Sequence, residues 1–69
     1  MAANDVQSGD LAELSSISTT LEDILHRIDT MSGCYEGTPR EDFAARLREV
    51  ERALGSTVRR LESVLRTSR

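Results

Sequence analysis

The chain has no lysine and no tryptophan, and it contains only one cysteine, one histidine and one proline. Without a second cysteine, Cys34 cannot form a disulfide within the chain, and His26 alone leaves too few ligands for a Cys/His metal site. The sequence also lacks a glycine-rich phosphate loop and any pair of carboxylates placed around a pocket. We therefore expect no enzymatic activity, no cofactor, no metal and no small-molecule substrate.

Apolar stretches are short, and none approaches the roughly 20 residues of a membrane-spanning helix. The first residues lack the basic and apolar regions of a signal peptide, so we expect a cytoplasmic protein without a membrane partner. All nine basic residues are arginine, whose codons are rich in G and C, which indicates a bacterial genome of high G+C content. A chain of 69 residues buries only about 60% of its unfolded surface, so we expect self-association to stabilise it.

Two heptad patterns dominate the rest of the sequence and predict two helices. In residues 10–31 the apolar residues alternate at spacings of three and four, with a positions at Leu14, Leu21 and Ile28 and d positions at Ile17, Ile24 and Met31. Ser32-Gly33 favours a helix end there. The second pattern contains Phe43, Leu47, Val50, Leu54, Thr57, Leu61 and Val64. Thr38-Pro39-Arg40-Glu41 precedes it, which predicts a capped helix over residues 38–67.

The short connection over residues 32–37 predicts an all-α fold, an antiparallel, coiled-coil-like hairpin that forms one domain over residues 10–69 after a flexible tail, residues 1–9. An a-to-d pairing would place Ile28 opposite Phe43 and Ile24 opposite Leu47. The distribution of charge favours the same pairing of the two helices. Residues 1–37 contain seven acids and one arginine (net −6), whereas residues 38–69 contain five acids and eight arginines (net +3).

The e positions next to this seam are also largely apolar or small. Such a wide apolar stripe is typical of helices in a four-helix bundle, so we expect two hairpins to associate as a homodimer. The surfaces expected to associate are at the e positions and at the open end of the second helix: Leu11, Ser18, Leu25, Ala44, Val58, Leu61, Val64 and Leu65.

Three further features are candidates for function. Arg48, Arg52, Arg59 and Arg66 form a candidate stripe for an anionic partner, although nearby acids and the absence of interleaved aromatics favour a solvated, paired face. Cys34 and Tyr35 lie at the expected loop tip, where they either cap the seam or contact a partner. His26 lies on the outer face without a second group to orient it as a base.

These patterns predict a non-enzymatic interaction module that self-associates and docks onto a larger protein as a regulator, adaptor or accessory subunit. Two alternatives stay open from the sequence. The first is a small nucleic-acid-associated regulator that uses the arginine stripe. The second is an accessory subunit of a larger enzyme.

Overall fold

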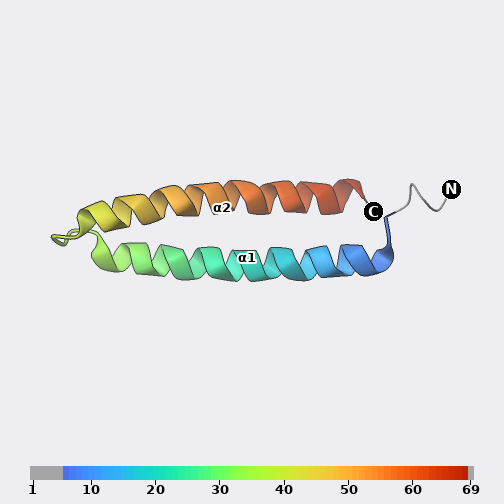
Figure 1. Cartoon of the computed structure of the whole chain (residues 1–69), viewed down its shortest axis with the longest axis horizontal. Coiled ribbons are helices and arrows are strands. Elements are labelled where there is room, and N and C mark those ends of the chain that lie inside the picture. The colour runs from blue at the N-terminus through green and yellow to red at the C-terminus, as the bar shows by residue number, and fades with distance from the viewer. Residues whose placement is uncertain (1–5, 69) are drawn as a thin grey trace.

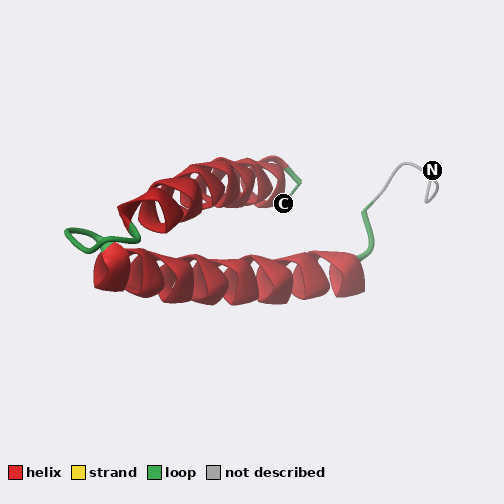
Figure 2. Cartoon of the chain, turned by 60° about the vertical axis from the view of Figure 1, so that its left-hand side comes forward, coloured by secondary structure: helices red, strands yellow, loops and turns green. Residues whose placement is uncertain are grey.

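A computed structural model of the chain describes residues 6–68 as two long antiparallel helices, with no strand among them. Helix α1 spans Ser8–Tyr35 and helix α2 spans Glu41–Thr67. The two helices lie side by side along their whole lengths, joined by one loop at one end (Figures 1 and 2). The resulting rod measures 58 × 15 × 14 Å. The expected all-helical hairpin is therefore confirmed.

Both ends of α1 extend beyond the predicted bounds. Of the expected tail, residues 1–5 lie outside the described residues, while Ser8 and Gly9 already belong to the helix. At the other end α1 continues through Ser32-Gly33 to Tyr35. Ser32 is fully buried there, and its hydroxyl donates to the Ile28 carbonyl at 3.0 Å. The left-handed glycine that ends the helix is Gly37, with a φ of 76°.

Helix α2 begins at Glu41 rather than at Thr38, and the expected capping box forms in a shifted arrangement. The Thr38 hydroxyl accepts a hydrogen bond from the Arg40 backbone N–H at 3.2 Å. The Glu41 carboxylate accepts one from the Gly37 N–H at 3.0 Å, one residue before the expected partner. Thr38 thus organises a turn of residues 38–40 that leads into the helix, and the loop covers residues 36–40 instead of 32–37.

The longer α1 shifts the register of the hairpin by one heptad. Phe43 was expected opposite Ile28, but its ring packs edge-on against Tyr35, with the ring centroids 5.0 Å apart. Farther along, Arg48 contacts Asp29, and Leu25 lies beside Gly55. The predicted pairs are therefore wrong by about two turns, because the chain reverses direction after Tyr35 and not after Met31.

The seam between the helices also uses different rows of side chains from those predicted. The side chains buried most deeply are all at e positions, and the a positions of both helices are half-buried beside them. These e residues are Ser18, Ser32, Ala44, Val58 and Leu65. Three of the five are serine or alanine, which allow the two backbones to approach closely, whereas the bulky d residues do not. The seam is consequently built from the a and e rows, and the d row lies beside it.

Candidate functional site

A row of apolar side chains stays exposed along the hairpin. Ile17 and Met31 of α1 keep 42% and 47% of their surface accessible, and Val50 and Val64 of α2 each keep 46%. Half-buried Ile24 and Phe43 continue the row. We call these six d-position residues the apolar row: Ile17, Ile24, Met31, Phe43, Val50 and Val64.

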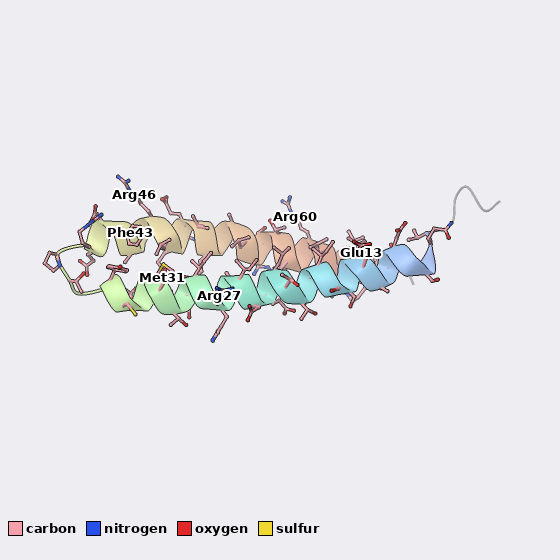
Figure 3. All side chains as sticks on the ribbon, turned by 60° about the horizontal axis from the view of Figure 1, so that its bottom comes forward. Glu13, Arg27, Met31, Phe43, Arg46 and Arg60 are labelled. Carbon is pink, nitrogen blue, oxygen red and sulfur yellow. The ribbon has the colours of Figure 1, made fainter. Side chains whose placement is uncertain are left out.

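The apolar row lies on one side of the hairpin. Each of its residues directly precedes a seam residue, as Met31 precedes Ser32 and Phe43 precedes Ala44. In an α-helix, the side chain one residue earlier points about 100° away around the helix axis. Because the two helices are antiparallel, the residues that precede the seam residues of α1 and of α2 point to the same side of the hairpin. Near the loop, Met31 of α1 and Phe43 of α2 lie close to each other (Figure 3). The two helices therefore present one continuous face.

Most residues of the predicted association surface do not lie on this face. Ser18, Ala44, Val58 and Leu65 are buried within the hairpin itself. The other members at e and a positions, Leu11, Leu25 and Leu61, are half-buried. Only Val64 belongs to the exposed row. The sequence predicted that the e row would be exposed and the d row buried, whereas in the structure the e row is mostly buried and the d row is mostly exposed.

The charged side chains at the rim of the apolar face do not pair as the predicted register implies. The a-to-d register would bring Glu13 near Arg60 and Arg27 near Arg46. In the structure Arg46 and Arg60 extend from α2 away from α1, and Arg27 extends from α1 away from α2 (Figure 3). Arg27 approaches Asp23 of its own helix at 4.0 Å. The described residues thus contain no ion pair between Glu13 and Arg60.

A cluster of charges occupies the opposite edge of the hairpin and connects both helices with the loop. The Arg48 guanidinium donates to Asp29 of α1 at 2.6 Å and to Glu51 of α2 at 2.9 Å. It also contacts the Glu36 carboxylate at the end of α1 at 3.0 Å. One arginine therefore holds three carboxylates from three parts of the chain. We call these four residues the Arg48 cluster.

The Arg48 cluster changes the acid–base properties of its members. The hydrogen bond from the Arg48 guanidinium holds the pKa of the Asp29 carboxyl below its ordinary value. Hydrogen bonds to Asp29 and Glu36 raise the pKa of Arg48, so the guanidinium stays charged.

This pKa shift predicts acid sensitivity. Because the pKa of Asp29 in the folded chain lies below its ordinary value of about 3.9, ionised Asp29 favours the folded state above about pH 4. That contribution is lost as the pH falls through the lower, folded value. We expect the melting temperature, followed by circular dichroism, to fall more steeply below pH 4 in the wild type than in Asp29→Asn. Arg48→Gln should show the same reduced slope. Coincident slopes for the wild type and Asp29→Asn would contradict the role of the cluster.

The four arginines of the predicted stripe have different surroundings in the structure. Arg48 is engaged by the three carboxylates, whereas Arg52, Arg59 and Arg66 are exposed and form no ion pair within residues 6–68. Arg52 and Arg59 line an open groove of about 650 Å³ around Gly55, together with His26 and acidic neighbours from both helices. The groove carries charges of both signs, so it does not form a uniformly basic surface.

The residues expected at the loop tip are in the last turn of α1. Cys34 is exposed and unpaired within the described chain. Tyr35 covers Phe43, as expected for a residue that caps the seam, yet 37% of its surface stays accessible. The loop end of the hairpin is therefore closed by an aromatic pair.

Residues 6–68 contain no group of three or more histidine, cysteine or acidic side chains that could hold a metal ion. Within the same residues, neither helix has a stretch that is both long and apolar enough to cross a membrane. The geometry thus singles out two features, the apolar row and the Arg48 cluster.

Comparisons with protein-family models, with curated proteins and with solved structures find no match to this chain.

Proposed function

We propose that the protein is a non-enzymatic interaction module that self-associates through the apolar row, so that two hairpins form a four-helix bundle. The observation that carries this proposal is the exposure of four large aliphatic side chains on one side of a rod that is only two helices thick. Contiguous apolar patches on a protein surface mark sites of association. In this proposal the bundle serves a larger protein as a regulator, adaptor or accessory subunit.

The size of the face agrees with a stable dimer. The hairpin is 58 Å long and 15 Å wide, and each partner in a standard protein interface buries about 800 Å². A face with these dimensions reaches that area when most of its length is covered. The helices of a four-helix bundle pack in this way, each with one apolar stripe toward its own hairpin and another toward the partner.

Sedimentation equilibrium tests the proposal. We expect the wild type to sediment at twice its monomer mass of 7.7 kDa at micromolar concentration. Changing both Ile17 and Val50 to aspartate should raise the dissociation constant at least about 100-fold, because each change removes apolar burial and desolvates a charge in both copies.

The matched control adds the same two carboxylates outside the apolar row. Ala12 and Ala45 are exposed helical positions on the outer side of the hairpin, and the variant with aspartate at both should remain a dimer. A wild-type chain that sediments as a monomer would rule out self-association. A control variant that dissociates as readily as Ile17→Asp/Val50→Asp would show that net charge, and not the apolar row, governs assembly.

A further inference from the structure

Two hairpins can place their apolar rows face to face in two symmetric arrangements. In one, the two loops lie at opposite ends of the bundle and each helix packs on its own copy. In the other, the loops lie at the same end and each α1 packs on α2 of the partner. We propose the second arrangement, with the two-fold axis parallel to the long axis of the rod. This inference rests on the proposed function.

The charges of the two helices favour this arrangement. Helix α1 (Ser8–Tyr35) contains five acids and one arginine, a net charge of −4, and helix α2 (Glu41–Thr67) contains five acids and six arginines, a net charge of +1. With the loops at opposite ends, the acidic α1 would lie on the acidic α1 of the partner. With the loops at the same end, acidic and basic helices alternate around the bundle, and every neighbouring pair has opposite net charge. Like-charge juxtaposition across an interface is unfavourable, so charge selects the alternating bundle.

The positions of the apolar residues are compatible with the same arrangement. The contacts of Asp29 with Arg48 and of Leu25 with Gly55 place Met31 near the level of Val50, and Ile17 near the level of Val64. A two-fold axis along the rod keeps these levels unchanged in the second copy. Met31 would then pack on the partner's Val50, and Ile17 on the partner's Val64, so aliphatic side chains meet near both ends of the bundle.

The arrangement has a consequence for the bundle as a whole. Both loops, with the exposed Cys34 and Tyr35 side chains beside them, lie at one end, and the start of α1 at Ser8 and the end of α2 at Thr67 lie at the other end in both copies. The Arg48 clusters of the two copies face outward on opposite sides, because they occupy the edge away from the apolar row. The two ends of the bundle therefore differ, and one end carries two copies of the loop surface side by side.

The single cysteine provides a direct test. A nitroxide spin label attached to Cys34 of the full chain gives one label per copy, and pulsed electron paramagnetic resonance measures the distance between them. With the loops together the labels are separated only by the width of the bundle, about 15–25 Å for interhelix distances of 8–10 Å. With the loops apart, the rise of 1.5 Å per residue separates Cys34 and its copy by about 30 Å or more.

A second label position gives a larger contrast and guards against an effect of labelling the tip. In Cys34→Ser with Ser8→Cys, the label is at the exposed start of α1. The proposed arrangement again predicts about 15–25 Å, whereas loops at opposite ends predict about 45–50 Å. A dimer with the long distances overturns this inference and leaves the proposed function intact. A chain that is monomeric by sedimentation overturns both.

Discussion

Replacing Val58 by aspartate is expected to abolish the hairpin. Val58 is in the middle of α2 with only 5% of its surface accessible, so the new carboxylate would lie between the two helices without a partner. The substitution removes about 1.5–3 kcal/mol of apolar burial and adds several kcal/mol for an unpaired buried charge. A chain of this length has a stability of roughly 3–10 kcal/mol. We therefore expect the helical circular dichroism signal of Val58→Asp to be largely lost at 25 °C.

The same substitution at Val50 provides a matched control. Val50 is also in the central part of α2, but 46% of its surface is accessible because it belongs to the apolar row. Val50→Asp should weaken the dimer while the seam within each hairpin stays intact. Its helical signal should persist at low temperature, and its melting temperature should lose the dependence on protein concentration that an associating chain shows. Equal loss of helix in the two variants would contradict the assignment of the seam to the a and e rows.

The existence of both helices could be predicted from the sequence because a spacing of three and four is a local property of each segment. The end of α1 could not. Ser32-Gly33 has the composition of a helix end, but burial of Ser32 against α2 and packing of Tyr35 on Phe43 carry the helix on to Tyr35. These are tertiary contacts, and they decide how far a helix continues when local preference is weak.

The choice of seam was also beyond the sequence alone. The a, d and e rows all carry apolar or small residues, whereas two packed helices bury only two of these rows. Which rows are buried depends on how closely the backbones approach, and the small side chains of Ser18, Ser32 and Ala44 determine that distance. The e row is expected to be surplus because the a and d rows already form two continuous heptad patterns, but the small residues of the e row bring it into the seam. The sequence therefore indicated that one apolar row would stay exposed but named the e row, whereas the structure exposes most of the d row.

The Arg48 cluster was missed, although part of its signal is present in the sequence. Glu51 is three residues after Arg48, a spacing at which helical side chains meet. Asp29 and Glu36 reach the same guanidinium only in the observed register. In the predicted register Arg48 would lie nearly two turns away from Asp29, so it was assigned to an outer stripe. A register error of one heptad thus assigned Arg48, a residue that connects the two helices, to a candidate ligand-binding stripe.

Ser32 should be the position in α1 that is least tolerant of a larger side chain. It has no accessible surface, and its hydroxyl already bonds to the Ile28 carbonyl. Ser32→Leu would force the helices apart next to the loop, and overpacking of this kind costs about 1–3 kcal/mol. For a domain of this size each kcal/mol lowers the melting temperature by about 4–8 °C, so we expect a decrease of roughly 5–20 °C by circular dichroism.

Two controls separate the lack of space from other effects of the substitution. Ser32→Ala keeps a small side chain and has a higher helix propensity, so its melting temperature should equal or exceed that of the wild type even though the hydroxyl is lost. Gly33→Leu introduces the same leucine at the neighbouring position, where a Cβ atom would meet nothing within 4 Å; it should not destabilise the chain. If Ser32→Leu melts at the wild-type temperature, the helices do not approach each other near the loop as closely as a fully buried serine implies. The explanation that small side chains place the a and e rows in the seam would then be wrong.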